Sequence, residues 1–462
     1  MRYRRGSVAL VALILALALA LGAKELREAG EYPDPVPLQM SGLLGNGTTT
    51  YRIPPREARG ASYVPGSNVL RLPGGNLRYL PPDAAEPVTV PPGDPGARRA
   101  VAASRAWLEK GRVPGATREE RRISERALLD LGLLTDSNGA TVAARYKRWD
   151  YVWPRDASWA AVAFAASGHH EESYEILAFL AEAQKKDGTW HARYEPDGSP
   201  VDDGRAPQLD ATGWFPWAVW FYGATAPGGE YRAEDLWPAV RRSADAAAGS
   251  LGSDGLPPGG PDYWEIPTWK PNLGTSAPLR TGLRSAADLA EDLGHPTEAR
   301  RYAEAATRLD EAIAREFAPH GYPRTTRPGS GADAAVNFLA PPLAPPDPAV
   351  EKAIEAAAGK LRAPNGGMLP GERWRQKPTV AWTPETAFFA LSAAGNGDGE
   401  TADRYLEWLA EHRTSLGSFP EKVDGTGAPT TVAPLGWTNA TVLLALLAKE
   451  EPLPVPPEPA GP

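Results

Sequence analysis

The chain has 462 residues, 42% of them hydrophobic, which is enough for one large domain or two to three ordinary ones. Its net charge of -8 argues against a nucleic-acid partner, because such a partner selects for a basic face. The absence of cysteine excludes disulfides and cysteine-based metal sites, and the six histidines are scattered, so we expect no metal and no cofactor.

The N-terminus carries Arg2, Arg4 and Arg5, followed by an apolar run from Val8 to Leu21. Basic residues before an apolar run of this length are typical of a secretory signal. The run is a little short for a membrane span, so an uncleaved anchor is the alternative. We therefore predict a signal peptide or membrane anchor over residues 1–23 and an extracytoplasmic protein, secreted or anchored. Membrane contact is expected only through this segment.

Two margins of the chain are poor in regular patterns. Proline and glycine punctuate residues 24–93, and the short strand-like pieces between them predict an irregular extension or a small β element. The final residues, 450–462, are rich in proline and predict an extended or disordered tail.

Residues 94–449 contain helical patterns, with apolar residues three and four positions apart. The predicted helices cover roughly residues 118–133, 155–168, 170–186, 208–223, 232–250, 276–293, 296–317, 331–339, 348–361, 382–395, 399–413 and 435–449. These twelve helices make six hairpins, the number in an (α/α)6 barrel, so the predicted fold class is all-α. A superhelical array of hairpins is the alternative, but no fixed repeat period appears.

Loops rich in tryptophan and carboxylates precede the second, fourth, sixth, tenth and twelfth predicted helices, all of one parity. In a barrel whose inner and outer helices alternate, such loops meet at one end, at the N-termini of the inner helices. The sequence therefore favours a closed barrel with one mouth.

The loop before the second helix carries an arginine–aspartate pair and three aromatic residues: Arg155, Asp156, Trp149, Tyr151 and Trp153. Taken alone, Asp156 is more simply interpreted as a helix N-cap that forms a local salt bridge with Arg155. The functional interpretation is a sugar clamp, in which the carboxylate accepts from two hydroxyls and the guanidinium donates to another. The aromatic side chains then offer faces to the sugar ring.

The next loop contains Asp210 and Trp214, which we predict to line the same pocket, although Asp210 is equally suited to capping a helix. The spacing of Trp217 and Trp220 places both of these in the core instead.

Glu265 lies between Trp264 and Ile266 in a loop before the sixth helix. An apolar setting raises the pKa of a carboxyl group and holds its proton, as a general acid requires. The plain alternative is an ordinary loop glutamate. Trp264 is counted with the predicted substrate contacts.

Glu421 lies beside Lys422 and Asp424 in a polar, glycine-rich loop, and Trp437 begins the last helix after it. A carboxylate kept ionised there would act as a base, with Trp437 as a further substrate contact. For this segment alone, a solvated loop charge is the better interpretation.

These segments, in this order, resemble glycoside hydrolase family 15, the group of glucoamylases, glucodextranases and trehalases. The similarity covers roughly residues 118–449 and is carried by Tyr-x-Trp-Pro-Arg-Asp, Tyr-Trp-Glu and Pro-Glu-Lys-Val-Asp, with residues 333–342 as a further matching segment. It implies an (α/α)6 barrel that hydrolyses α-glucosidic bonds of an oligo- or polysaccharide, exo-acting at non-reducing ends and with inversion.

In this resemblance Glu265 matches the general acid and Glu421 the general base that activates water. Arg155 and Asp156 match the pair that grips the terminal sugar. Inversion requires two carboxyl groups roughly 6.5–9.5 Å apart, whereas about 5 Å would indicate a retaining mechanism. Ile266 departs from the second acidic residue of starch-degrading fungal members, which puts a leaving-group contact and starch-like substrates in question.

A second departure is that residues 24–117 leave no room for the large N-terminal β-sandwich of bacterial members. One alternative function is a catalytically silent carbohydrate-binding protein at the cell surface, which the presence of both glutamates argues against. Another is a lyase of acidic polysaccharides on a similar toroid. That chemistry favours Tyr, His or Arg near a uronate, whereas the predicted mouth is rich in carboxylates.

Overall fold

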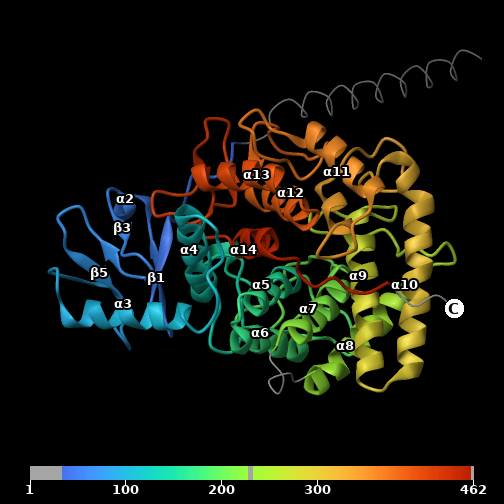
Figure 1. Cartoon of the computed structure of the whole chain (residues 1–462), viewed down its shortest axis with the longest axis horizontal. Coiled ribbons are helices and arrows are strands. Elements are labelled where there is room, and N and C mark those ends of the chain that lie inside the picture. Colours follow the sequence, from blue (N-terminus) through green and yellow to red (C-terminus); the bar gives the residue numbers. More distant parts are fainter. Residues whose placement is uncertain (1–33, 227–232, 459–462) are drawn as a thin grey trace, which may run out of the picture.

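The computed structural model describes residues 34–226 and 233–458 (Figure 1). The predicted signal peptide or anchor and the last residues of the predicted tail therefore lie outside the described residues. Within the part of the chain that is described, no helix combines the length and apolar character that crossing a membrane requires.

Six segments form a closed inner ring in the order of the chain. They are α5 (Pro154–Ala166), α7 (Ala211–Thr225), α9 (Leu273–Asp292), the 3-10 helix η3 (Ala334–Leu339), α12 (Thr383–Gly395) and α14 (Gly436–Glu450). Each contacts the next, and α14 contacts α5, which closes the ring. Of these, α5, α7 and α14 are buried on nearly all sides, the pattern of helices enclosed by others.

Six outer helices each pack mainly on one inner segment, as Figure 1 shows around α14 and α5. They are α4 (Arg118–Leu134), α6 (His170–Ala183), α8 (Ala233–Ser250), α10 (Pro296–Glu316), α11 (Pro348–Leu361) and α13 (Gly399–Glu411). Unlike the inner helices, α10 buries one stripe that includes Tyr302 and Leu309 and exposes the opposite side. The prediction of an all-α (α/α)6 barrel is confirmed.

One inner position differs from the others. The predicted helix 331–339 is only the 3-10 helix η3, which begins after Asp333 and is followed by Pro341 and Pro342. Proline has no N–H to continue a helical ladder, so the segment ends after six residues.

Glycine sets the spacing between two inner helices. A Cβ atom on Gly213 of α7 would lie 2.1 Å from the carbonyl oxygen of Pro278, and one on Gly282 of α9 would lie 2.4 Å from that of Gly213. Only glycine permits this approach.

Aromatic side chains fill the centre of the ring. Trp159 of α5 lies edge-on to Trp214 and Trp217 at ring distances of 5.3 and 5.2 Å, and Trp437 lies 6.2 Å away. The prediction that Trp217 and Trp220 belong to the core is confirmed, since they are 0% and 8% exposed.

Before the barrel, the chain forms two small antiparallel sheets. The first pairs β1 (Gly42–Gly45) with β2 (Thr50–Ile53), and the helical turn α2 (Pro55–Ala58) follows. The second contains β3 (Ser62–Tyr63), β4 (Leu70–Arg71), β5 (Leu77–Tyr79) and β6 (Val88–Val90), in that order. Helix α3 (Pro95–Leu108) contacts both β5 and α4, so it joins this unit to the barrel (Figure 1).

A third sheet lies at the barrel mouth and connects two of its loops. It consists of β7 (Ala381–Trp382), β8 (Lys422–Val423) and β9 (Pro429–Thr430), all antiparallel. The 3-10 helices η1 (Lys147–Trp149) and η2 (Ala318–His320) belong to other loops.

Candidate active site

A cavity of about 310 Å³ lies at the N-terminal ends of the inner helices, where α5, α12 and α14 begin. Loops from distant parts of the sequence meet there, as the parity of the predicted helices indicated. Eight of the predicted site residues line it: Trp149, Trp153, Arg155, Asp156, Trp264, Glu265, Glu421 and Trp437.

Three predicted residues lie elsewhere. Trp214 is fully buried and packs in the aromatic core, because the first turn of α7 directs it into the barrel centre. Asp210 is buried behind the cavity wall, 3.3 Å from the guanidinium of Arg155. Tyr151 lies against the guanidinium of Arg193, 4.4 Å from its ring centroid. None of the three lines the cavity.

Arg155 and Asp156 form a buried pair at the start of α5. The Arg155 Nε lies 3.3 Å from Asp156 Oδ2, and its guanidinium donates to Gln208 Oε1 at 2.6 Å and lies over the Trp437 ring. The interpretation of Asp156 as a helix cap is wrong, since Trp153 occupies that position without a side-chain cap. Burial raises the pKa of Asp156 to about 6, against the lowering effect of Arg155. At neutral pH the carboxylate is thus ionised and can accept from sugar hydroxyls.

Glu265 is held by donors from three other positions. Trp153 Nε1 donates to Oε1 at 2.5 Å, Gln208 Nε2 donates to the same oxygen at 3.2 Å, and Arg205 forms an ion pair with Oε2. The predicted apolar setting is therefore wrong for the carboxyl group, although Trp264 beside it is buried. The apolar neighbours in sequence do not surround the carboxylate.

The backbone of Glu265 has φ = 58°, a left-handed conformation that is uncommon for a residue with a side chain. Its N–H donates to the carbonyl of Asp262 at 2.7 Å, and the N–H of Trp264 donates to Asp262 Oδ1 at 3.0 Å. Such a conformation persists only where the surroundings fix it.

A buried ionic network lies under this loop. Arg324 donates to Asp262 Oδ1 at 2.9 Å and to Asp333 Oδ2 at 3.2 Å, and its guanidinium lies 3.5 Å from the Trp264 ring centroid. Tyr263 donates its hydroxyl to Asp333 Oδ1 at 2.6 Å. Burial raises the pKa of Asp262 to about 6, which Arg324 opposes. The network ties the Glu265 loop to the segment that begins η3.

Glu421 directly precedes β8. Trp149 Nε1 donates to its Oε1 at 3.0 Å, and Lys422 Nζ lies 3.5 Å from its Oε2. Its side chain is only 13% exposed, and Oε2 is buried without a hydrogen-bond partner. The interpretation as a solvated loop charge is therefore wrong. An unpartnered carboxylate oxygen in a cavity wall is available to a water molecule or a substrate hydroxyl.

Glu385, which the sequence analysis did not single out, also lines the cavity. It lies in the first turn of α12, is 4% exposed, and has a buried Oε2 without a hydrogen-bond partner. Burial, with the charge of Glu421 adding to it, raises its pKa to about 8. At neutral pH Glu385 therefore offers the cavity a proton donor. The sequence carries little signal for it, since a glutamate in the first turn of a helix is ordinary and is favoured there by the helix dipole.

We expect the substitution Glu385→Gln to remove a pH-dependent loss of stability. Between its ordinary pKa of 4.5 and about 8, folded Glu385 keeps a proton that the unfolded chain releases, so its stabilising contribution is full below 4.5 and lost by about pH 8. Glutamine has no proton to lose. Urea unfolding should give variant and wild type similar stabilities near pH 5. At pH 8.5 the variant should be the more stable protein, since each tenfold difference in proton affinity between the folded and unfolded chains corresponds to about 1.4 kcal/mol. A constant difference between the two proteins across this pH range would contradict the assignment.

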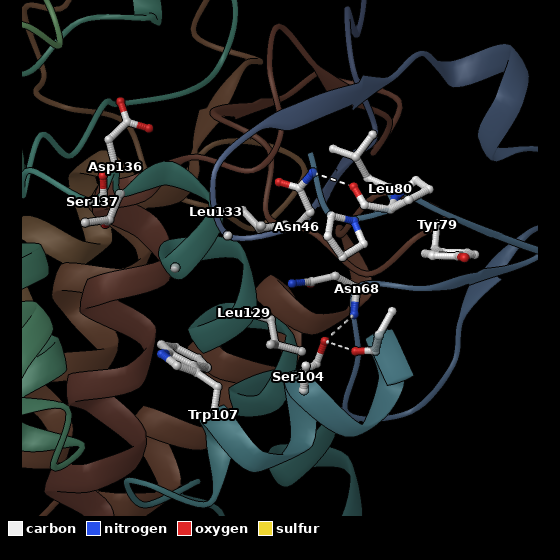
Figure 2. A pocket seen from close by; sticks show the side chains of 18 of the residues that line it. Asn46, Asn68, Tyr79, Leu80, Ser104, Trp107, Leu129, Leu133, Asp136 and Ser137 are labelled. Carbon is white, nitrogen blue, oxygen red and sulfur yellow. Dashed lines mark hydrogen bonds between the residues drawn. The ribbon is translucent and has the colours of Figure 1, made fainter. Parts of the chain in front are cut away.

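A larger cavity, of about 760 Å³, lies between the N-terminal sheets and the barrel (Figure 2). It contains neither Glu265 nor Glu421. Its amides serve the structure: Asn46 donates to the carbonyl of Pro81 at 2.6 Å, and Asn68 Oδ1 accepts from Arg126 at 2.9 Å. We therefore place the chemistry in the smaller cavity, where the carboxyl groups meet.

The part of the barrel from α4 to just after η3 matches a known family model. The sequence model described as "Glycosyl hydrolases family 15" matches residues 121–345. An uncharacterized glycosyl hydrolase of Methanocaldococcus jannaschii is 23% identical over 351 residues, which make up 70% of this chain and 55% of that protein. The chain therefore spans about half the length of that curated relative.

Solved structures of the same fold agree. A bacterial glucoamylase complexed with acarbose has a TM-score of 0.64 at 19% identity, over 78% of this chain and 60% of that chain. A wild-type glycosidase has a TM-score of 0.61 at 19% identity, over 71% of this chain and 96% of that chain. A family 15 glucoamylase from Hypocrea jecorina has a TM-score of 0.57 at 16% identity, over 70% of this chain and 69% of that chain. At these identities the likeness concerns the fold. Together with the sequence match, it confirms the resemblance to glycoside hydrolase family 15.

Proposed function

We propose that this chain, whose barrel matches glycoside hydrolase family 15, is an exo-acting hydrolase that cleaves α-glucosidic bonds with inversion. The observation that carries the proposal is the meeting of Glu265 and Glu421 in one cavity with the buried Arg155–Asp156 pair. The two glutamates lie on different loops and take their hydrogen bonds from different tryptophans. Two separate carboxyl groups with room for water between them are what inversion requires.

The buried pair supports exo action. Asp156 Oδ2 and Arg155 Nε are both buried, and they contact only each other, at 3.3 Å, without a hydrogen bond to any other group. Such groups are satisfied when sugar hydroxyls donate to the carboxylate and accept from the guanidinium. The proposal places the terminal sugar on this buried pair with its glycosidic bond directed toward the mouth, so that cleavage releases one sugar at a time.

In the proposed reaction, Glu265 gives a proton to the glycosidic oxygen as its bond to the anomeric carbon breaks. Glu421 takes a proton from water as the water oxygen attacks that carbon from the opposite face. The products are a free sugar of inverted anomeric configuration and a glycan shortened by one unit. Lys422 and Trp149 contact the two oxygens of Glu421 and orient the carboxylate for this role.

Arg205 has a defined part in this scheme. Both oxygens of Glu265 accept hydrogen bonds: Oε1 from Trp153 and Gln208, and Oε2 from Arg205. In the proposed reaction the proton is donated from Oε2, whose single partner is the exposed Arg205. Donation from Oε2 therefore requires the leaving-group sugar to displace Arg205. The side chain of Arg205 is 34% exposed, so water is available to its guanidinium when it is displaced.

The test is to incubate the protein with a panel of α-1,4-, α-1,6- and trehalose-type glucosides and follow the released glucose by proton NMR. We expect β-glucose to appear first from at least one member, before mutarotation, because inversion of an α-linkage gives the β-anomer. Early α-glucose would overturn the mechanism. Binding of the panel without any release of glucose would favour the catalytically silent carbohydrate-binding protein.

A further inference from the structure

We propose that a second subsite, centred on Trp269, binds an anionic group on the leaving-group side of the glycan. The subsite consists of Trp269, Lys270, Arg327 and Arg373, which line a hollow of about 580 Å³. The inference rests on the proposed function, because it assigns a class of substrate to that active site. The ligand is an oligosaccharide that carries a phosphate, a sulfate or a carboxylate.

The exposure of Trp269 is the first observation. Its side chain is 99% exposed, while the other large hydrophobic residues that are exposed in the described structure, Val36 and Val88, are 42% and 38% exposed. Tryptophan is on average a well-buried residue, and its flat face is a suitable platform for a sugar ring.

The loop under Trp269 is fixed rather than loose. The N–H of Thr268 donates to the carbonyl of Gly260 at 3.1 Å, and its hydroxyl donates to the carbonyl of Lys270 at 2.8 Å. Asn272 Nδ2 donates to the carbonyl of Gly260 at 3.1 Å. The exposed ring is thus presented on a hydrogen-bonded base, which lowers the entropy cost of binding.

The charge of the hollow is the second observation. Lys270, Arg327 and Arg373 line it together with no carboxylate, and none of the three takes part in an ion pair among the described residues. Arg373 donates to the carbonyl of Gly329 at 3.2 Å, which joins two of the lining loops. The whole chain has a net charge of -8, so a hollow lined by three cations is opposite in sign to the protein as a whole. A concave surface lined by one sign of charge attracts the opposite sign.

The position relative to Glu265 indicates which part of the substrate reaches the hollow. Trp269 follows Glu265 by four residues, so the two Cα atoms are separated by at most about 14 Å. Trp374, next to Arg373, lines the catalytic cavity and packs on Trp264 at a ring distance of 4.7 Å. Because the general acid faces the leaving group, a glycan that leaves the cavity past Glu265 reaches Trp269 within a few sugar units.

The test compares four tetrasaccharides: maltotetraose and isomaltotetraose, each neutral and each with a phosphate at the reducing end. Affinities are measured by calorimetry at low ionic strength, with Glu421→Gln as the background so that the ligand persists. We expect the better-bound backbone to gain at least tenfold in affinity from its phosphate, and this gain to disappear in 0.5 M salt. Equal affinities for the neutral and phosphorylated forms would overturn the proposal.

Substitutions in the hollow test whether the gain in affinity from the phosphate arises at this subsite. Lys270→Ser with Arg327→Ser and Arg373→Ser should abolish the phosphate gain and leave the neutral affinity unchanged, whereas Trp269→Ala should weaken both forms. The charge-matched control is Arg59→Ser with Arg71→Ser and Arg98→Ser, three exposed arginines on the N-terminal unit that should keep the full gain. Loss of the gain in this control would show a general charge effect and contradict the assignment.

Two further measurements separate this inference from its alternatives. Hydrolysis of the neutral tetrasaccharides by the wild type tests the proposed function alone, while the ratio of affinities tests the subsite. Binding of the wild type to phosphatidylglycerol vesicles through Trp269, without a phosphate gain on either tetrasaccharide, would instead make the hollow a membrane-surface contact and overturn the proposal.

Discussion

Substitution of Glu421 by glutamine is expected to lower kcat on a cleaved α-glucoside by about 10²- to 10⁴-fold, the usual contribution of a general base. Glutamine has nearly the same shape, and its amide oxygen still accepts from Trp149 Nε1, which lies 3.0 Å from the present carboxylate. It cannot take a proton from water. The chemical step should therefore fail while the fold remains.

The same loss is expected for Glu265→Gln, with a different pH profile. In a bell-shaped dependence of kcat/KM, the base gives the acidic limb and the acid gives the alkaline limb. The residual activity of Glu421→Gln should therefore lack the acidic limb, and that of Glu265→Gln the alkaline limb. Steady-state rates from pH 4 to 9 and a thermal melt of each variant provide the measurement. Wild-type activity in either variant would overturn the assignment of the two roles.

Local sequence was a good guide to where the mouth lies. The loops before α5, α9 and α14 carry the predicted cavity residues, and a helix start can be recognised from nearby residues alone. The helix starts placed Asp156, Glu265 and Glu421 at the same end of the barrel, where they line one cavity, whereas their roles were assigned from the family resemblance. The alternation of inner and outer helices correctly predicted that loops more than 250 residues apart in the sequence meet, as Trp149 and Glu421 do.

Local sequence was a poor guide to what surrounds each carboxyl group. The neighbours of Glu265 in the chain are apolar, but its hydrogen-bond donors come from positions 112 and 57 residues away, and Arg205 from 60 away. Trp264 directly precedes Glu265, and Trp214 follows Asp210 by one helical turn, yet only Trp264 lines the cavity. Whether a side chain lines the cavity or packs in the core depends on how all six helix pairs close the barrel. No single segment of the sequence specifies this.

Arg324 shows what the long-range contacts contribute, and its substitution by alanine is expected to cost about 3–5 kcal/mol of stability. The change leaves Asp262 and Asp333 facing each other at 0% and 1% exposure, without the guanidinium that now pairs with both. A buried pair of carboxylates without a counterion cannot keep both charges. Urea unfolding at pH 7 measures the loss. Arg404→Ala, which removes an exposed pair with Glu400, should cost no more than about 0.5 kcal/mol.

The Arg324 variant should also recover at acid pH, and this separates a charge effect from a simple loss of packing. Without Arg324 the two buried carboxyls bind protons more tightly in the folded than in the unfolded chain. The folded state is therefore stabilised relative to the unfolded state as the pH falls. Adding Asp262→Asn and Asp333→Asn should restore part of the stability at pH 7, because neither amide needs a counterion. If neither acid pH nor the two amides restore stability, Arg324 acts through its stacking on Trp264 and not through its charge.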